Sequence, residues 1–423
     1  MKILVVGRGG REHAVVKKFK RDGIEAIFCA PGNPGMHEAT LVDIEETQAD
    51  QLAAWAKEND IDLTVVGPEM ALMAGVVDAF EGHGLKAFGP KKAAAYIEGS
   101  KAFAKRLMKK YSIPTAAYGE FDHTQVEDAL AFLETQVMPI VIKADGLAAG
   151  KGVVICQTLE EAKQTINEML VDASFGEASA RVVIEEFLDG EEFSLMSFVA
   201  GDKFYPMPIA RDYKRAYDHD EGLNTGGMGA HSPHPLITDE DYQQALETVI
   251  KPTVDAMMSE GLPFTGVLYA GLIKTADGPK VIEFNARFGD PETEVVLPLL
   301  ETDLSTALLE LMAGKDVEMK WRSEQTVGVV LAAKGYPAEY VKGVPIKALD
   351  TLEDVDIYHM GTDVVNGECV TNGGRVLFVV AKGADLAAAR AKVYHEIKKI
   401  DCDDLFYRGD IAQLAESSEA SLN

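Results

Sequence analysis

Apolar runs and amphipathic stretches alternate along the first hundred residues. Residues 2–7 and 62–68 are short apolar runs that lead into glycine, a pattern that predicts buried parallel strands. Residues 12–20 follow the first run with helical character, and residues 87–90 close the segment. These β-turn-α units predict a small doubly wound α/β domain over residues 1–100.

Helical and strand patterns are mixed in the rest of the chain. Helices are predicted over residues 91–111 (a linker helix), 159–170, 239–261 and 303–312, and strands over 138–143, 153–156, 181–188, 266–274 and 281–287. From Thr326 onward the pattern is β-rich and ends in a helix over 385–400. This tail is predicted to form a separate C-terminal lobe.

Residues 211–230 differ from both kinds of segment. They are polar, contain several glycines and have little periodicity. The composition predicts a functional loop, and a disordered connector is the alternative.

Composition limits the fold and the ligands. At 423 residues the chain exceeds what one core normally fills, so three or four packed units are expected. The 47% hydrophobic content is enough for ordinary cores, whereas a net charge of −27 disfavours nucleic acid and anionic membranes as partners. Any bound phosphate must therefore be held by local lysine, arginine and backbone amide groups.

The cysteines and the N-terminus both predict a cytoplasmic protein. Four cysteines, Cys29, Cys156, Cys369 and Cys402, lie far apart without metal-type pairing and are expected to be reduced thiols. The first apolar run is too short for a signal peptide or a membrane span, and Arg8 and Arg11 follow it.

The stretch 281–292 carries the most chemistry. On a strand, Glu283, Asn285 and Arg287 would point to one face, with Ile282 and Phe284 on the other. Carboxylate and amide oxygens suit Mg²⁺ shared with nucleotide phosphates, and an arginine can grip a carboxylate or phosphate. The face therefore predicts a metal-nucleotide site, and a strand with a solvated polar face is the alternative.

Two glycine-rich turns are candidate phosphate sites, although neither matches a standard motif. Residues 7–12 carry Glu12 where a dinucleotide fingerprint needs its third glycine, which leaves a phosphate or sugar at the helix start as the alternative to a plain turn. Residues 144–152 lack the Walker spacing. Lys143 and Lys151 flank these glycines and favour phosphate contact over an ordinary hairpin.

The order of several motifs resembles the phosphoribosylamine–glycine ligase family, also called glycinamide ribonucleotide synthetases, within the ATP-grasp superfamily. The motifs span nearly the whole chain and lie at residues 7–13, 31–35, 66–69, 143–152, 224–230, 283–292 and 373–377. The resemblance implies an α/β and α+β multidomain fold. Its parts would be an N-terminal α/β domain (1–100), a large ATP-grasp lobe (101–120 and 190–326), a small ATP-grasp lobe acting as ATP lid (121–189) and a β-rich C-terminal lobe (327–423).

The resemblance also implies a reaction in which ATP, glycine and 5-phospho-β-D-ribosylamine give glycinamide ribonucleotide, ADP and phosphate through glycyl phosphate. Mg²⁺ (or Mn²⁺) would be held by Glu283 and Asn285. The residues expected to bind ATP are Lys101, Lys105, Lys143, Gly146, Gly150, Lys151, Gly152, Glu185, Glu186, Phe187, Leu188 and Glu192. Within this set, the end of the strand 185–188 would meet adenine and Glu192 the ribose.

The remaining site residues are expected to bind the two other substrates. They are Gly9, Gly10, Arg11, Glu12 and Asn33 for the phosphoribosyl group, and Asp212, Asn224, Thr225, Gly226, Gly227 and Arg287 around glycine. Arg287, Asp212 and Lys143 are the expected catalytic residues. The partners are then small molecules, without nucleic acid or membrane, and we expect a monomer.

Two other functions stay open from the residues. One is an ATP-grasp ligase for a different amine or carboxylate, and the other is a nucleotide sensor or degenerate ligase. The sequence 224–229, Asn-Thr-Gly-Gly-Met-Gly, argues against the first, and the lysines and acids at the expected phosphate and metal positions argue against the second. Residues 267–271 hold no second metal-binding acid, so the number of metal ions stays open.

Overall fold

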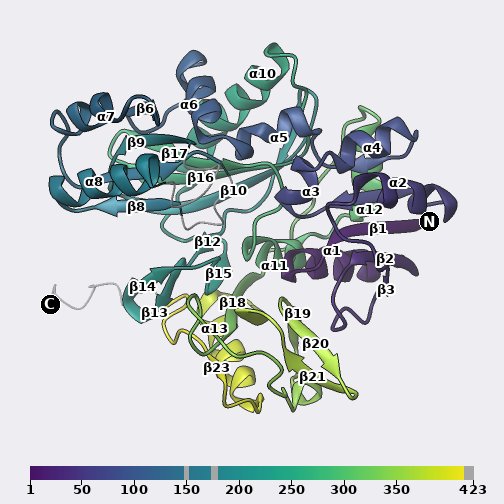
Figure 1. Cartoon of the computed structure of the whole chain (residues 1–423). Helices are drawn as coiled ribbons and strands as arrows, with labels where there is room; N and C mark the ends of the chain where they lie inside the picture. The colour runs from purple at the N-terminus through teal and green to yellow at the C-terminus, as the bar shows by residue number, and fades with distance from the viewer. Residues whose placement is uncertain (147–151, 173–179, 414–423) are drawn as a thin grey trace, which may run out of the picture.

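A computed structural model describes residues 1–146, 152–172 and 180–413 of the chain. In Figure 1 the N-terminal domain lies on the right, the small lobe with α7 and α8 on the left, and the C-terminal lobe below them. The large lobe, built on β10, β16 and β17, lies between the first two. The predicted α/β and α+β multidomain class is confirmed.

The N-terminal domain is a parallel five-stranded sheet of order β3-β2-β1-β4-β5. Its strands are β1 (Lys2–Gly7), β2 (Ala26–Pro31), β3 (Thr40–Leu41), β4 (Leu63–Val66) and β5 (Ala87–Phe88). Its helices are α1 (Gly10–Arg21), α2 (Ala49–Glu58), α3 (Glu69–Met73) and α4 (Val76–Gly82). The apolar run Ile3–Val6 is fully buried between the helices, as a central parallel strand requires.

The predicted linker helix over 91–111 is two helices, so the single-helix prediction is wrong. Helix α5 (Lys92–Gly99) ends at Ser100, and α6 (Lys101–Lys110) begins there. Ser100 has extended backbone angles, and its hydroxyl accepts a hydrogen bond from Phe103 N at 3.1 Å. This serine N-cap starts a new helix and sets the direction of Lys101 and Lys105.

The two ATP-grasp lobes each contain a four-stranded antiparallel sheet. The small lobe has the order β6-β9-β7-β8, with β6 (Tyr118–Asp122), β7 (Ile140–Ala144), β8 (Val153–Cys156) and β9 (Arg181–Glu186), and with helices α7 (Val126–Leu133) and α8 (Leu159–Ile166). The large lobe has the order β11-β10-β16-β17, with β10 (Glu191–Ala200), β11 (Lys203–Pro206), β16 (Thr265–Thr275) and β17 (Gly278–Asn285), and with helices α9 (Asp239–Ala245) and α10 (Lys251–Ser259).

Strand β17 departs from strict alternation. The pairing of β16 with β17 shifts between Gly271 and Leu272, which makes a bulge at Ile282 and Glu283. Val281 and Phe284 are buried in the core, whereas the two neighbours Ile282 and Glu283 are both half-buried. The predicted opposite placement of Ile282 is therefore wrong, because the extra residue of a bulge interrupts the period of two.

Residues 211–230 form strands, so neither an irregular loop nor a disordered connector describes them. They contain β12 (Arg211–Asp212), the hairpin β13 (Arg215–Tyr217) and β14 (Glu221–Asn224), and the start of β15 (Gly229–Ser232). Strands β12 and β15 extend the sheet of the C-terminal lobe, in the order β12-β15-β18-β22-β19. The large-lobe segment of the sequence prediction thus contributes two strands to the neighbouring lobe.

The rest of the C-terminal lobe matches the predicted β-rich tail and final helix. Its elements are β18 (Gln325–Ala333), β19 (Val355–His359), β20 (Thr362–Val365), β21 (Glu368–Thr371), β22 (Arg375–Gly383), α13 (Leu386–Glu396) and β23 (Leu405–Phe406). Helices α11 (Glu292–Val296) and α12 (Leu304–Met312) connect the large lobe to this sheet.

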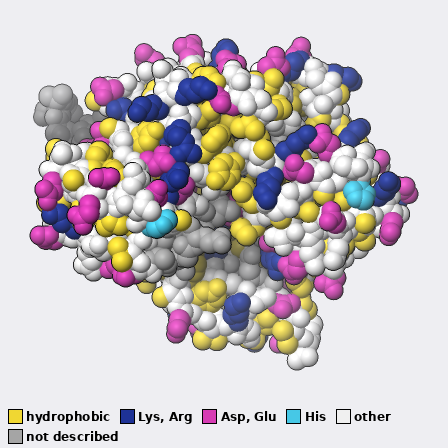
Figure 2. Space-filling view, turned by 45° about the horizontal axis from the view of Figure 1, so that its top comes forward, with side chains coloured by type: hydrophobic (Ala, Val, Ile, Leu, Met, Phe, Trp, Pro, Cys, Tyr) yellow, Lys and Arg dark blue, Asp and Glu magenta, His cyan; other side chains and the backbone are white. Residues whose placement is uncertain are grey.

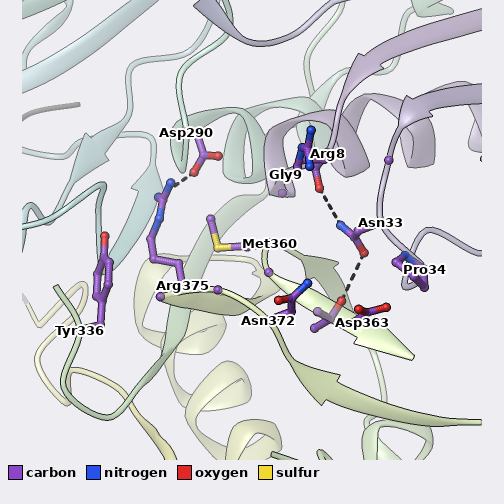
Figure 3. Close-up of a pocket in the computed structure, with 16 residues that line it drawn as sticks. Arg8, Gly9, Asn33, Pro34, Asp290, Tyr336, Met360, Asp363, Asn372 and Arg375 are labelled. Atoms are coloured by element: carbon purple, nitrogen blue, oxygen red, sulfur yellow. Dashed lines mark hydrogen bonds and ion pairs between the residues drawn. The ribbon is translucent and has the colours of Figure 1, made fainter. Parts of the chain in front are cut away.

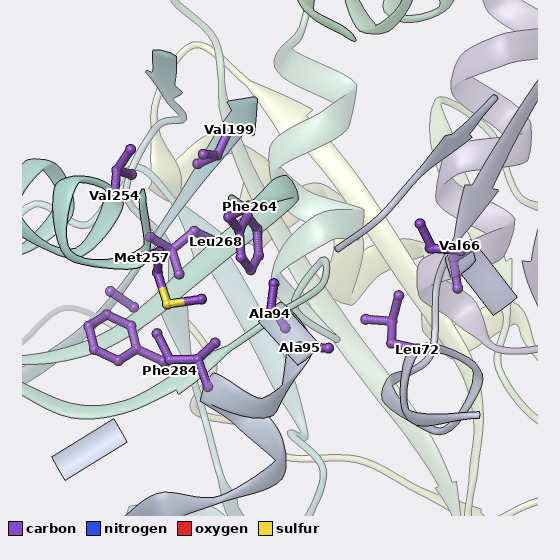
Figure 4. Close-up of a cluster of buried hydrophobic side chains, with 14 of the residues drawn as sticks. Val66, Leu72, Ala94, Ala95, Val199, Val254, Met257, Phe264, Leu268 and Phe284 are labelled. Atoms are coloured by element: carbon purple, nitrogen blue, oxygen red, sulfur yellow. The ribbon is translucent and has the colours of Figure 1, made fainter. Parts of the chain in front are cut away.

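One buried cluster joins the N-terminal domain to the large lobe. Figure 4 shows Val66 and Leu72 from the first together with Leu268 and Phe284 from the second, all members of the same apolar cluster. Because Phe284 lies next to Glu283, this shared core holds the polar end of β17 against the N-terminal domain.

The surface agrees with the composition. Over the face in Figure 2, Lys and Arg side chains lie interspersed with Asp and Glu side chains. Among the described helices, none is long and apolar enough to cross a membrane.

Candidate active site

A cavity of about 750 Å³ lies between the N-terminal domain, the two ATP-grasp lobes and the first residues of the C-terminal sheet. Most of the predicted site residues line it: Arg11, Lys101, Lys105, Lys143, Gly146, Gly152, Glu185, Glu186, Phe187, Leu188, Glu192, Asp212, Asn224, Thr225, Gly226, Glu283, Asn285 and Arg287. The predicted residues Gly150 and Lys151 lie outside the described part of the chain. Residues distant in sequence thus share one wall.

Lys105 of α6 and Lys143 of β7 share one glutamate, Glu185 of β9. Lys105 Nζ lies 2.9 Å from Glu185 Oε2, and Lys143 Nζ lies 3.1 Å from Glu185 Oε1 without hydrogen-bond geometry. Lys105 also donates to Thr115 Oγ1 at 2.7 Å, and Lys143 to the Ile282 carbonyl at 3.0 Å. Burial lowers the pKa of Lys105 to about 8 despite the attraction of Glu185.

Lys101 stands at the start of α6 and donates to the Gly146 carbonyl at 2.8 Å. Burial lowers its pKa, while Glu283 opposes the shift. Lys101 therefore contacts the turn that begins the glycine-rich segment, and Lys143 lies three residues before Gly146 on β7.

The adenine prediction needs a correction at Glu185. Strand β9 is central, since β6 and β7 pair with it on either side as far as Glu185 and Glu186. Both backbone edges of β9 are therefore occupied by the sheet at Glu185, and the Glu185 side chain lies beside Lys105 and Lys143. Phe187 and Leu188 lie beyond these ladders and line the cavity.

Glu192 lies at the start of β10 and pairs with Lys214, a residue that the sequence prediction missed. The Lys214 Nζ to Glu192 Oε2 distance is 2.8 Å. Attraction to Lys214 lowers the pKa of Glu192. The pair connects the ATP-grasp large lobe to the hairpin segment.

Glu283 and Asn285 project from β17 into the cavity as predicted. The Asn285 Oδ1 atom accepts a hydrogen bond from Arg287 Nη2 at 3.3 Å. Within the described ranges, no group of three His, Cys, Asp or Glu side chains is arranged to hold a metal ion. The carboxylate of Glu283 and the amide oxygen of Asn285 are donors that suit a hard cation such as Mg²⁺, which keeps waters and shares its shell with phosphates.

Arg287 is half-buried between Glu69 of the N-terminal domain and Glu98 of the linker helix α5. Its Nε atom lies 3.2 Å from Glu69 Oε2, and Nη2 lies 2.9 Å from Glu98 Oε1. Burial opposes ionisation of Glu69, but Arg287 and Arg11 outweigh it and lower the pKa of Glu69 to about 2. Sequence reasoning quoted Glu69 in a motif without a site role and missed Glu98, which carries no local signal.

Asp212 lines the cavity together with Asn224, Thr225 and Gly226. Burial, with the charge of Glu292 next in weight, raises its pKa well above the ordinary value, and Oδ1 has no hydrogen-bond partner in the described residues. A Cβ atom at Gly227 would lie 2.6 Å from this oxygen, and Gly227 has φ +110. Only glycine allows the loop 224–227 to pass so close to Asp212.

A second cavity of about 370 Å³ opens between the N-terminal domain and the C-terminal lobe (Figure 3). The predicted residues Gly9, Gly10 and Asn33 line it. Asn33 Nδ2 donates to the carbonyls of Arg8 and His359, at 2.7 and 3.0 Å. Asn33 therefore braces the wall that joins the two domains.

Glu12 holds the start of α1, and it does not appear among the described residues that line either cavity. Its carboxylate accepts from Gly9 N at 2.7 Å and from Arg11 Nε at 2.5 Å. A Cβ at Gly7, where φ is +127, would lie 2.6 Å from this side chain. The carboxylate thus fills the space beside the turn.

Asp290 and Arg375 line both cavities, and sequence reasoning assigned a site role to neither. Arg375 Nη1 lies 2.7 Å from Asp290 Oδ1 and donates to the Gly226 carbonyl at 2.7 Å. Figure 3 shows the two side chains pointing toward each other at the edge of the smaller cavity. The motif residues 373–377 contained the available signal.

Comparison with known proteins identifies the family of the chain. Three family models match in order: phosphoribosylglycinamide synthetase N domain at residues 1–98, ATP-grasp (A) domain at 99–293 and C domain at 326–414. The chain belongs to the phosphoribosylglycinamide synthetase family. The resemblance inferred from the motifs is confirmed.

Relatives of this family member agree along its length. A phosphoribosylamine–glycine ligase of Halalkalibacterium halodurans is 53% identical over 99% of this chain and 98% of its own. The enzyme of that name from Listeria innocua is 52% identical over 98% and 100%.

Solved structures support the fold. The phosphoribosylamine–glycine ligase of Thermotoga maritima has a TM-score of 0.87 at 35% identity, covering 97% of this chain and 100% of its own. The biotin carboxylase domain of Hydrogenobacter thermophilus 2-oxoglutarate carboxylase has a TM-score of 0.74 at 15% identity, covering 96% and 91%. The second likeness shows the ATP-grasp fold alone.

Proposed function

We propose that this protein uses ATP to join glycine to 5-phospho-β-D-ribosylamine, giving glycinamide ribonucleotide, ADP and phosphate, the second step of de novo purine synthesis. The observation that carries the proposal is that two cavities share Asp290 and Arg375 as lining residues. One cavity offers lysines and metal-type oxygens, and the other offers a glycine-rich helix start. A phosphorylated amine in the second could meet an activated acid in the first.

The chemistry requires activation before ligation. A carboxylate is a poor electrophile because its leaving group would be oxide, so ATP first phosphorylates glycine to glycyl phosphate. The ribosylamine nitrogen then attacks the acyl carbon. A C–N bond forms, the C–O bond to phosphate breaks, and the amine proton leaves.

On the phosphate side, Lys101 and Lys143 neutralise phosphoryl oxygens, and Glu185 bridges Lys143 and Lys105. Phe187 and Leu188 meet the base beyond the β9 ladders, and Glu192 meets the ribose. These assignments rest on charge, burial and position along the cavity wall.

Glu283 and Asn285 are proposed to hold Mg²⁺ (or Mn²⁺). When bound, the ion screens phosphate charge during transfer. The support comes from the oxygen donor set at the end of β17, opposite lysines of the small-lobe half.

On the substrate side, Arg287, Asp212 and the loop 224–227 bind glycine and the charge that develops on it. Arg11 adds positive charge beside Arg287 in the larger cavity, since both lie close to Glu69. Gly9, Gly10 and Asn33 form the wall for the phosphoribosyl group, and Glu12 supports that wall from behind.

The test is product formation by purified protein. ADP release is expected only when ATP, glycine, Mg²⁺ and freshly generated ribosylamine are all present, and mass spectrometry should find glycinamide ribonucleotide. ADP release without that product, or with another amine in its place, would contradict the proposal. We also propose that the protein is a monomer, which sedimentation analysis would check. We propose that it acts in the cytoplasm, which cell fractionation would check.

A further inference from the structure

Arg408, in the last segment of the C-terminal lobe, is an arginine that is only 1% exposed and whose bonds cross to another segment. Its Nε and Nη2 atoms donate to Asp410 Oδ1 and Oδ2, at 2.8 and 2.7 Å. Its Nη1 atom donates to Asp220 Oδ1 at 2.9 Å and to the Arg215 carbonyl at 3.1 Å. Asp220 and Arg215 belong to the β13–β14 hairpin region, so the guanidinium bridges two parts of the chain.

The tip of this hairpin is held by the same segment. Gly409 N donates to Asp218 Oδ1 at 2.7 Å, and His219 N donates to Asp410 Oδ2 at 2.8 Å. His219 and Asp220 have φ values of 60 and 54, in the left-handed region that residues other than glycine adopt uncommonly. Such a conformation persists where surrounding contacts enforce it, and residues 408–410 supply those contacts.

The hairpin leads directly into the proposed glycine loop. Strand β14 ends at Asn224, and Thr225 returns to the strand β13 side by donating to the Lys214 carbonyl from N and Oγ1, at 2.7 and 2.8 Å. Asn224 and Thr225 line the larger cavity. A shift of the hairpin therefore shifts these residues with it.

A nearby arginine provides a contrast. Arg390 donates to the carbonyls of Ile411 and Gly409, at 3.0 and 2.6 Å. It holds the same segment to α13 but makes neither of these bonds to the hairpin. Only Arg408 of the two combines the segment with the hairpin.

We propose that Arg408 is a positioning residue for glycine, acting through the hairpin 215–224 on the loop 224–227. The inference rests on the proposed function, because it takes that loop as part of the glycine site. Lys101, Lys143 and Glu283 lie on other elements. The Lys214–Glu192 pair links the hairpin segment to one proposed ATP residue, so KM for ATP is expected to change less than KM for glycine.

The experiment compares steady-state kinetics of Arg408→Lys and Asp220→Ala with the matched control Arg390→Ala. Lysine cannot reproduce the fork of bonds, so KM for glycine should rise about tenfold, while KM for ATP and kcat stay within about twofold. Asp220 is partly exposed, so its variant should raise KM for glycine about threefold. Arg390→Ala should leave all three values unchanged.

Amide exchange supplies a readout besides activity. In Arg408→Lys, faster exchange is expected in the amides of residues 215–227. An unchanged KM for glycine in both folded variants overturns the inference, as does an equal rise in KM for ATP. If Arg408→Lys fails to fold, Asp220→Ala decides. Wild-type protein that makes no glycinamide ribonucleotide overturns the proposed function instead.

Discussion

In the proposed function, the larger cavity has a phosphate side around Lys105 and Lys143 and a glycine side around Arg287. Charged side chains are paired on both sides, but the pairs are assembled differently. On the phosphate side Glu185 lies between Lys105 and Lys143, and all three come from residues 105–185. On the glycine side Arg287 of the large lobe meets Glu69 and Glu98 of the N-terminal domain and its linker. The first arrangement joins α6 to the small lobe, whereas the second joins the large lobe to the N-terminal domain and its linker.

The difference has an energetic basis. A buried charge without a partner costs several kcal/mol, so each half must neutralise its cations before substrate arrives. The phosphate side uses one acid for two lysines, which leaves net positive charge for ATP. On the glycine side, Glu69 and Glu98 both pair with Arg287, and Arg11 lies close to Glu69. These acids hold the Arg287 guanidinium in place and leave little positive charge without a partner.

The largest expected effect comes from removing the proposed metal-binding charge. Glu283→Gln should lower kcat about a thousandfold, because the phosphoryl oxygens lose their counterion while the side chain keeps its shape. Thermal unfolding should be unchanged. The measurement is ADP release under saturating substrates, with exposed Glu318→Gln as the control, and near-normal turnover would remove Glu283 from the metal site.

The pairing of Lys105 and Lys143 with Glu185 can be broken at the shared acid. Glu185→Gln leaves two buried lysines without their acid, so the free energy of unfolding should fall by about 3 kcal/mol. Denaturant unfolding measures the change. Glu186→Gln, at an exposed position on the same strand, should lose less than about 0.5 kcal/mol, and equal losses would show that Glu185 does not have this role.

The pairing of Arg287 with Glu69 and Glu98 can be tested by changing the arginine. Lysine keeps the charge but reaches one acid at a time, so Arg287→Lys should lower kcat/KM for glycine about thirtyfold. KM for ATP should change little. Arg106→Lys, at an exposed arginine paired with Glu120, is the matched control, and a parallel loss for ATP would contradict the separation of the two sides.

The smallest expected effect is a pH dependence on the phosphate side. Burial lowers the pKa of Lys105 to about 8 from 10.5, so the lysine loses its proton as pH rises past 8. KM for ATP should then rise about threefold between pH 7 and pH 9. Lys105→Met should remove this rise, and an identical profile in the variant would assign it to another group.

The effect of the same lysine on protein stability has the opposite sign, because a higher pH should weaken ATP binding but raise the free energy of unfolding. Between about pH 8 and 10.5 the unfolded chain keeps a proton that the folded chain has lost. The free energy of unfolding therefore rises with pH across that window in wild type relative to Lys105→Met. Chemical denaturation at several pH values would detect it, and a falling difference would contradict the sign.

Several elements were predictable because their patterns are local. The run 2–7, the glycine after it and the helix that follows specify β1 and α1, and the polar positions 283 and 285 identified the cavity end of β17. The bulge at Ile282 was not predictable, since it depends on the register with β16. The break at Ser100 did have a local signal, because a serine directly after Gly99 is a favoured N-cap residue.

By itself, the sequence determined the sheet of the N-terminal domain, the family, and most of the charged side chains that line the larger cavity. It did so because periodicity and motif spacing are properties of neighbouring residues. The tertiary structure decided that Glu185 serves two lysines and that Glu69 and Glu98 hold Arg287. It also decided that Arg375 contacts the loop 224–227 and that Arg408 contacts the β13–β14 hairpin. These contacts join residues far apart in the chain, and the physical reason is that a buried charge takes its partner from whichever lobe packs beside it.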